Sequence, residues 1–486
     1  MGVLLLFNGG FMMLSTLVSI VTDDGKSVEL ALAALLTLLV GSILALIARN
    51  HTKQLNKREG YLIVSLGWLL MSCSGMLPYL MTDTFTDFSS AFFETMSGYT
   101  TTGSSVLADI EQVPKGVLFW RSTTHWIGGM GIIVLAIAIL PLLGIGGMQL
   151  FTAEAPGPSS DKLHPRITDT AKRLWYIYVG FTLLETLLLW AAGMSLFDSI
   201  NHAMSTVSTG GFSTKNASIS FWNETPLIQY IITAFMFIAG VNFVLSYYVF
   251  TGQVKKITAD EEFRFYAQMI GICTLVVAVF IVLKVDLSAT QLDYPQPMGK
   301  IESAFRHALF QVTAVITTTG FVTADFTAWT PVLTLLFFGL MFMGGSAGST
   351  SGGIKGVRHF LMIKSGLMEF KRSLHPNAVL QIRYNKSVVQ ENVIHNIYGF
   401  FILYMLSFII GALGFSLMGI DFESAIGVAA SSLGNVGPAL GEFGPSFSFH
   451  AMPLGGKLWA SFLMLIGRLE LFTVLILFTP FFWKKI

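Results

Sequence analysis

Ten long apolar runs constrain this chain more than any other feature of its sequence. A bilayer core about 30 Å thick is crossed by roughly 20 apolar residues in a helix. The runs lie near residues 1–21, 28–48, 60–81, 122–146, 174–195, 226–250, 265–285, 331–354, 393–418 and 457–480. We therefore predict an all-α integral membrane protein with ten candidate spans.

Composition supports the same class. Only 12% of the 486 residues are charged and 53% are hydrophobic, whereas soluble chains carry about 25% charge. So little charge excludes a nucleic-acid binder and an ordinary cytosolic enzyme, because the surface would not stay hydrated. The two cysteines lie in apolar runs, and no catalytic Ser/His/Asp set or zinc pattern has a workable spacing. We expect no enzymatic activity, and a retained amino-terminal helix rather than a signal peptide.

Four shorter apolar segments lie between the long runs, near 87–100, 197–208, 301–317 and 421–432. They are too short to cross a bilayer, and each ends in a patch of hydroxyl residues and glycine. Irregular backbone at membrane depth is tolerated only where it is buried or lines a water-filled path. We expect these segments to be half-helices that enter the membrane from outside and return.

The basic residues orient this model. With a cytoplasmic amino terminus and four re-entrant segments, 20 of the 29 Lys and Arg residues fall inside, as the positive-inside rule requires. They are Arg49, Lys53, Lys57, Arg58, Lys162, Arg166, Lys172, Arg173, Lys255, Lys256, Arg264, Lys355, Arg358, Lys364, Lys371, Arg372, Arg383, Lys386, Lys484 and Lys485.

The short segments are copies of one another. Aligning Gly103, Gly211, Gly320 and Gly434 places hydroxyl pairs before each glycine, at 100–101, 208–209, 317–318 and 431–432. A long apolar helix with glycine near its middle follows each copy, at Gly128, Gly240, Gly344 and Gly467. The unit of helix, half-helix, loop and helix recurs at about 110 residues. We predict an amino-terminal helix pair (1–50) and four pore repeats, at 51–155, 156–255, 256–385 and 386–486.

Cation chemistry explains such a pattern. A dehydrated cation needs oxygen ligands, and stacked backbone carbonyls supply them where glycine permits a positive φ. Each half-helix also points the negative end of its dipole toward the centre. Four copies in one chain can close a ring around one axis by pseudo-symmetry.

Six motifs stand in a specific order along the chain. They are SGYTTTG at 97–103, WIGGMGIIVL at 126–135, STGGFST at 208–214, GGSAGSTSGG at 344–353, HPNA at 375–378 and GRLE at 467–470. In this order they resemble the Trk/Ktr/HKT superfamily of potassium transporters, and within it the bacterial TrkH/TrkG-type pore subunits. The resemblance covers nearly the whole chain and implies a multi-pass protein of the bacterial inner membrane.

The resemblance implies a potassium filter built from the four loops. Gly103 stands where sodium-favouring members often have serine, which favours potassium as the transported ion; no other cofactor is expected. Leu433 departs from the other copies and removes side-chain symmetry from the ring. The implied filter residues are Thr101, Thr102, Gly103, Thr209, Gly210, Gly211, Thr318, Thr319, Gly320, Leu433, Gly434 and Asn435.

A glycine-rich loop and one deep arginine form the predicted gate. Five glycines within 344–353 are more than one helix accepts at about 1 kcal/mol each, so we expect a loop beneath the filter. A phosphate-binding loop is disfavoured because the Gly-Lys-Ser/Thr ending is missing. Arg468, an intramembrane charge, is a functional candidate by default. The predicted gate residues are Arg468, Gly344, Gly345, Ser346, Ala347, Gly348, Ser349, Thr350, Gly352 and Gly353.

The sequence thus predicts potassium uptake through a gated, channel-like pore. The resemblance implies a homodimer on a cytosolic, TrkA-type nucleotide-binding regulatory ring. The basic stretches 162–173 and 355–386 are the candidate docking surface, although the positive-inside rule explains them almost as well. Beyond these partners we expect only membrane lipid and no nucleic acid. The alternative is a sodium- or proton-coupled potassium symporter with alternating access. Four parallel repeats favour the pore, because alternating-access folds more often use inverted pairs.

Overall fold

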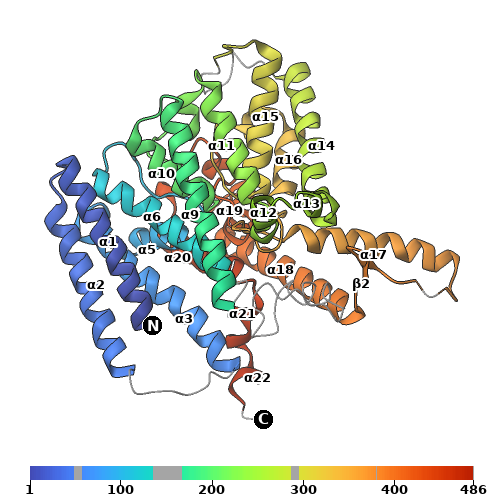
Figure 1. Ribbon diagram of the computed structural model, residues 1–486, viewed down its shortest axis with the longest axis horizontal. Coiled ribbons are helices and arrows are strands. Elements are labelled where there is room, and N and C mark those ends of the chain that lie inside the picture. Colours follow the sequence, from blue (N-terminus) through green and yellow to red (C-terminus); the bar gives the residue numbers. More distant parts are fainter. Residues whose placement is uncertain (49–56, 135–166, 286–294, 379, 485–486) are drawn as a thin grey trace.

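The structure, a computed structural model, describes residues 1–48, 57–134, 167–285, 295–378 and 380–484 (Figure 1). The predicted boundaries near 50 and 155 lie outside these ranges, as do Arg49, Lys53, Lys162, Arg166 and Lys485. Within them helices predominate and the described strands are two residues each, which confirms the predicted all-α class.

The helices follow one another in the predicted order of long and short segments. In the first half they are α1 (Gly2–Thr22), α2 (Ser27–Ala48), α3 (Lys57–Gly75), α4 (Leu77–Met81), α5 (Phe88–Tyr99), α6 (Lys115–Val134), α9 (Ile167–Ala191), α10 (Leu196–Val207), α11 (Pro226–Ala239) and α12 (Phe243–Phe250). In the second half they are α13 (Lys255–Ala259), α14 (Glu261–Lys284), α15 (Lys300–Ile316), α16 (Pro331–Leu340), α17 (Gly356–Leu374), α18 (Glu391–Leu417), α19 (Phe422–Gly434), α20 (Leu454–Arg468), α21 (Phe472–Leu475) and α22 (Pro480–Trp483).

Short elements complete the described chain. A small hairpin pairs β1 (Arg383–Tyr384) with β2 (Ser387–Val388). The 3-10 turns are η2 (Ser218–Trp222), η3 (Phe326–Ala328), η4 (Gly441–Phe443), η5 (Phe449–Ala451) and η6 (Ile476–Phe478).

The amino-terminal helices α1 and α2 form the predicted pair, packed along each other at one side of the molecule (Figure 1). Helix α1 also lies against α3 and α6. Asp24, at the turn between α1 and α2, accepts a 2.7 Å hydrogen bond from the Gly116 backbone N–H at the start of α6. The pair is therefore attached to the first repeat.

Four short helices, α5, α10, α15 and α19, confirm the half-helix prediction to within a few residues. Three of them begin with a side-chain cap: Asp87, Ser195 and Asp421 accept backbone N–H groups three residues ahead. Such a cap satisfies an N–H group that would otherwise lack a partner. The hydrogen bonds from Ser424 lower the pKa of Asp421, whose carboxylate caps α19 outside the membrane-spanning helices. The side-chain cap therefore marks the start of three of the four half-helices, and α15 begins after Gly299 without one.

The helices after the loops correct the sequence prediction of ten continuous spans. Six described helices are long and apolar enough to span a membrane, and two bent pairs also qualify: α11 with α12 at 107° and α20 with α21 and η6 at 110°. The run at 331–354 is not one helix either, because α16 ends at Leu340. The breaks fall at the glycines that we expected inside helices, since Gly240 caps α11 and Gly467 is next to the last residue of α20.

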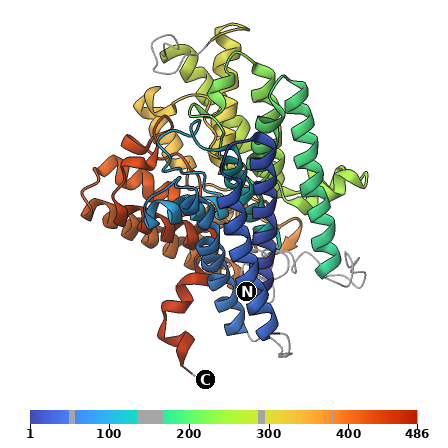
Figure 2. The same cartoon turned by 90° about the vertical axis from the view of Figure 1, so that its left-hand side faces the viewer.

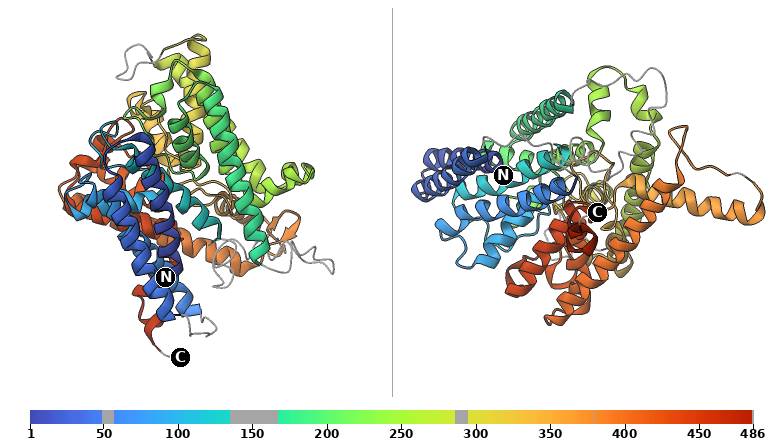
Figure 3. Two further views of the ribbon diagram at one scale, coloured as in Figure 1. Left: turned by 60° about the vertical axis from the view of Figure 1, so that its left-hand side comes forward. Right: turned by 90° about the horizontal axis from the view of Figure 1, so that it is seen from below.

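The repeats are arranged around a central axis. Helix α6 packs against α10, α11 against α15, and α20 against α5, so that helices following one loop lie on the half-helix of the next repeat. Viewed from below, the colours of the chain progress around the centre in sequence order (Figure 3, right). In the turned view helices α1 and α2 run side by side at the front, and the carboxyl-terminal α22 reaches the bottom (Figure 2). The four loops therefore meet at the middle.

Candidate functional site

The four half-helices end in the same turn. In the first, the N–H of Thr101 bonds to Gly98 O and the N–H of Thr102 to Ser97 O, at 3.0 and 2.9 Å. The corresponding bond pairs start at Thr209, Thr318 and Asn435 in the other three. This nested pattern is the Schellman motif that closes a helix with one left-handed residue.

That left-handed residue is a threonine in three of the loops. Thr101, Thr209 and Thr318 have φ values of 52°, 54° and 55°, and Asn435 has 54°. A β-branched residue rarely adopts this conformation, which costs of order 1–3 kcal/mol and concentrates at functional sites. The side chains of all four are fully buried. The strain indicates that the loop geometry matters more than local stability.

Glycines bring neighbouring loops into direct backbone contact. A Cβ atom on Gly103 would lie 2.2 Å from Gly210 O, and one on Gly211 would lie 1.9 Å from Thr319 O. The same holds at Gly320, 2.1 Å from Val436 O, and at Gly437, 2.8 Å from Thr102 O. The loops thus follow each other in the order one, two, three, four and back to one. They form a closed ring of backbone with no room for side chains at these positions.

The fourth loop is three residues out of the predicted register. Leu433 and Gly434 belong to α19, and it is Asn435, Val436 and Gly437 that match Thr101, Thr102 and Gly103 in φ pattern and ring contacts. The hydroxyl pair Ser431 and Ser432, which suggested the earlier alignment, lies inside the half-helix. Asparagine tolerates the left-handed conformation better than most residues, so the run 435–437 was the signal that the alignment overlooked.

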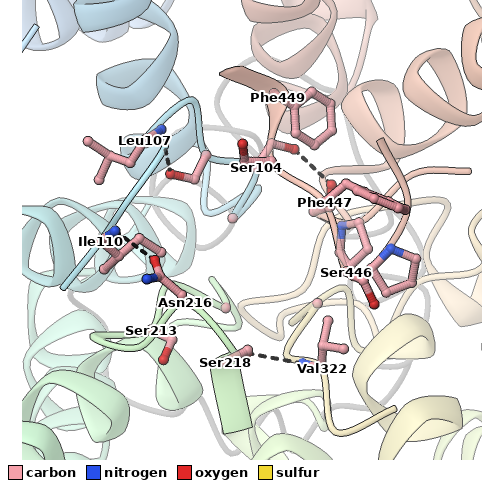
Figure 4. Close-up of a pocket in the computed structure, with 18 of the residues that line it drawn as sticks. Ser104, Leu107, Ile110, Ser213, Asn216, Ser218, Val322, Ser446, Phe447 and Phe449 are labelled. Carbon is pink, nitrogen blue, oxygen red and sulfur yellow. Dashed lines mark hydrogen bonds between the residues drawn. The ribbon is translucent and has the colours of Figure 1, made fainter. Parts of the chain in front are cut away.

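A cavity opens on the outer side of the ring. It has a volume of about 310 Å³ and is lined by all four loops, including Gly103, Gly211, Gly320 and Gly437. Figure 4 shows its wall, with Ser104 and Leu107 from the first loop facing Ser446 and Phe447 across it. Hydrogen bonds join segments from different repeats in this wall: Ile110 N–H donates to Asn216 Oδ1 at 2.7 Å, and Val322 N–H to Ser218 Oγ at 3.2 Å. The ring is therefore reached from one side through a polar vestibule.

The glycine-rich segment 344–353 is a loop directly against the other side of the ring. Its Gly352 N–H donates to Thr318 Oγ1 at 2.6 Å, and Thr350 Oγ1 donates to Val207 O and Ala239 O at 3.1 and 3.3 Å. A parallel bridge between Met343 and Ile354 closes its ends. The loop thus touches the second and third repeats at once.

Arg468 meets this loop, as the sequence predicted for a gate. Its side chain is 2% exposed, and its guanidinium donates to Thr350 O at 2.8 Å and Gly128 O at 3.4 Å. Glu470, two residues on, pairs instead with Arg358 of α17 at 2.6 Å. Arginine, the 344–353 loop and the ring of four loops therefore form one contiguous assembly.

Several residues outside the ring hydrogen-bond the chain that leaves the loops. Glu94 binds the chain after the first loop through Val106 N–H at 2.9 Å, and His202 bonds Ser213 Oγ at 2.9 Å in the second. Arg121 on α6 pairs with Glu94 at 2.6 Å. Sequence reasoning missed Arg121 because nothing in an isolated helix marks which loop carbonyl its side chain reaches.

The fold and the site define a class: a multi-pass membrane protein whose repeats bring four backbone loops into a ring, with a plug of irregular chain on one side. The family model "TrkH: Cation transport protein" matches residues 26–485. The chain belongs to this TrkH family, and it is a multi-pass protein of the inner membrane.

Named relatives agree over the full length. The chain is 40% identical over 494 residues to "Trk system potassium uptake protein TrkH" of Salmonella typhimurium, covering 100% of this chain and 98% of that protein. It is 36% identical over 436 residues to "Trk system potassium uptake protein TrkG" of Escherichia coli, covering 89% and 87%. The crystal structure of the potassium transporter TrkH from Vibrio parahaemolyticus superposes with a TM-score of 0.89 at 37% identity, covering 99% and 98%.

Proposed function

We propose that this protein carries potassium into the cell through a gated pore whose filter is the ring of four loops. The observation that carries the proposal is the closed backbone ring, in which Gly103, Gly211, Gly320 and Gly437 leave no space for side chains. Only backbone oxygen and the threonine hydroxyls can then face an ion on the axis. Such carbonyl rings replace the hydration shell of a cation. The potassium named for the relatives is the ion we assign here.

The loop 344–353 and Arg468 are the proposed gate. The loop contacts the ring through Thr318, and the arginine bonds to Thr350 O from across the pathway. A fixed positive charge opposes a cation in a low-dielectric passage. The pore conducts when the loop and the arginine separate and the path beneath the filter opens.

The Trk system named for the relatives implies a regulatory partner, which we propose to be the nucleotide-binding ring expected from the sequence, acting on a homodimer. Fewer basic residues of the stretch 355–386 are exposed than the sequence predicted for a docking surface. Lys355 is buried and donates to Ser351 O at 2.5 Å, and Arg358 is held by Glu470. Among the described residues of both predicted stretches, the exposed basic residues that remain for docking are Lys172, Lys371, Arg372, Arg383 and Lys386.

Ion flux into liposomes tests the filter. Purified protein is reconstituted, and uptake of potassium, rubidium, sodium and lithium is compared at equal concentration. We expect potassium and rubidium to enter faster than sodium and lithium. Equal rates for all four ions would remove the filter assignment.

Replacing Arg468 with alanine, or shortening the 344–353 loop, tests the gate. Both changes remove the barrier beneath the filter, so flux per incorporated molecule should rise without loss of ion preference. Unchanged flux in both variants would contradict the gate assignment.

A coupled potassium symporter remains the second candidate. Single-channel recording separates the two mechanisms, because a continuous pore gives unitary currents. Slow flux that requires a sodium or proton gradient would favour the carrier.

A further inference from the structure

A buried ion pair behind the first filter loop has no role in the proposed permeation pathway. Arg121 on α6 and Glu94 on α5 meet at 2.6 Å, and their side chains are only 3% and 0% exposed. Buried pairs contribute little net stability, because their attraction is offset by lost hydration. What such a pair does provide is a fixed geometry.

Glu94 uses its carboxylate to hold the chain that leaves the first loop. Oε1 accepts from Ser105 Oγ and Oε2 from the Val106 N–H, both at 2.9 Å. These residues follow Gly103 by two and three positions. The height of the first loop is therefore tied to the position of this carboxylate.

Arg121 reaches from the first repeat into the second. Its Nη1 donates to Ser213 O at 2.8 Å, and its guanidinium lies 3.5 Å from the centroid of the Phe212 ring. Phe212 follows Gly211 directly and also stacks on His125 at 3.8 Å. One planar side chain thus contacts both residues that leave the second filter glycine.

Arg121 has no arginine counterpart at the same count after the next two filter glycines. The positions eighteen residues after Gly103, Gly211 and Gly320 hold Arg121, Gln229 and Phe338. Gln229 accepts a hydrogen bond from Arg306 of the next half-helix rather than bonding a filter-loop carbonyl directly. The first and second loops are therefore joined by a charged fork, whereas the residues at the same count after the second and third filter glycines are an amide and an aromatic ring.

Building on the proposed filter, we propose that Arg121 and Glu94 are positioning residues that set the distance between the first and second loops and thereby the choice among alkali cations. A guanidinium presents its donors in a rigid plane, so it can bond the carboxylate, bond the Ser213 carbonyl and stack on Phe212 together. Lysine carries the same charge on a flexible stem and cannot make all three contacts. The neutralising carboxylate also cancels a positive charge at the wall of the outer vestibule.

The test compares ion preference in Arg121→Lys, Glu94→Gln and the unmodified protein reconstituted in liposomes. We expect Arg121→Lys to lower the ratio of potassium to sodium flux by roughly tenfold, as the loss of one hydrogen bond to a charged group would. Glu94→Gln should lower the same ratio. It should also reduce uptake of every cation at low ionic strength, because the charge of Arg121 at the vestibule wall is then no longer neutralised, and added salt should restore that uptake by screening this charge in the vestibule.

A matched control is Arg306→Lys. Arg306 forms a comparable buried pair with Glu302 at 2.8 Å, with side chains 1% and 19% exposed, but its described bonds go to Glu302 and Gln229 and not to a filter loop. We expect its flux ratio to stay within about twofold of the unmodified protein. The ratio of potassium to sodium flux does not depend on how much protein folds. It can therefore be compared between variants even if one of them inserts poorly into the liposomes.

The outcomes separate the two proposals. If the unmodified protein does not prefer potassium, the proposed filter fails. If it does, but Arg121→Lys and Glu94→Gln keep its ratio, only the positioning role fails. An equal fall in Arg306→Lys would also overturn that role, since any buried pair would then have the same effect.

Discussion

Three threonines of the ring have a backbone conformation that a β-branched side chain disfavours. Thr101, Thr209 and Thr318 adopt a left-handed conformation that suits glycine or asparagine. Two of the three hydroxyls have described uses: Thr318 Oγ1 accepts from the gating loop and Thr209 Oγ1 donates to Ser208 O. The buried Thr101 Oγ1 has no partner among the described residues. A hydroxyl oxygen in that state is suited to facing a cation at the inner end of the filter.

A substitution at Gly437 tests the corrected register of the fourth loop. Gly437→Ala adds a Cβ atom 2.8 Å from Thr102 O at a φ of 107°. The added atom must push the fourth loop away from the first, so we expect at least a tenfold loss of potassium over sodium preference in the liposome assay.

The matched control for this variant is Gly419→Ala. Gly419 also has a positive φ, 86°, but nothing lies within 4 Å of its Cβ position. It therefore carries the backbone strain of the substitution without the contact across the ring. Equal loss of preference in both variants would contradict the assigned register.

At the scale of elements, the half-helices were predictable and the helices that follow them were not. The half-helix bounds came from short apolar segments that end in hydroxyl residues and glycine, and their caps are local in sequence. The bends of 107° and 110° were missed because hydropathy averages across a kink and cannot separate one span from two angled pieces. The cause is tertiary: a Cβ atom on Gly467 would lie 2.0 Å from Leu433 O, a contact that no sequence window contains.

The contacts across the ring likewise depend on packing between residues that are far apart in the sequence. The sequence predicted that loop 344–353 and Arg468 act together, since both placed polar atoms at membrane depth. It could not show that Arg358 rather than Arg468 pairs with Glu470, because that pairing depends on how α17 packs. Local patterns identified the parts of the site, and packing between repeats decided their partners.

The loop 344–353, which we propose as part of the gate, gives a prediction at the scale of elements. Thr350→Val removes a hydroxyl whose single proton is shared between Val207 O and Ala239 O, while keeping the shape of the side chain. With that hydrogen bonding contributing about 1 kcal/mol, the loop should leave its closed position more often, and potassium flux should rise by roughly fivefold.

Thr251→Val is the control for that change. Thr251 bonds the carbonyl of Tyr247 at 3.2 Å on an exposed helix end. Its loss should leave flux unchanged. A rise in Thr251→Val equal to that in Thr350→Val would show that the effect is not specific to the loop.

For the whole molecule, the ring predicts that a bound ion stabilises the fold. The four loops come from repeats that span most of the chain, so an ion held by all of them binds only the folded state. At one hundred times its dissociation constant, such an ion adds about 2.7 kcal/mol to the unfolding free energy.

Thermal unfolding in detergent measures this stabilisation. The melting temperature should rise with potassium or rubidium concentration and stay constant with choline at the same ionic strength. Gly437→Ala should lose the ion-specific rise. A rise of equal size in choline would indicate a general salt effect and no site in the ring.

The closure of the ring also has a consequence for how the protein is made. The last junction joins residues 333 positions apart, through Ser104 Oγ donating to Gly437 O and Asn435 Nδ2 donating to Thr102 Oγ1. A growing chain cannot complete the ring until the ribosome has passed residue 437, and by then the plug at 344–353 has already been synthesised. In every chain long enough to close the ring, the segment 344–353 that we propose as part of the gate is therefore already present, while Arg468 is still to follow.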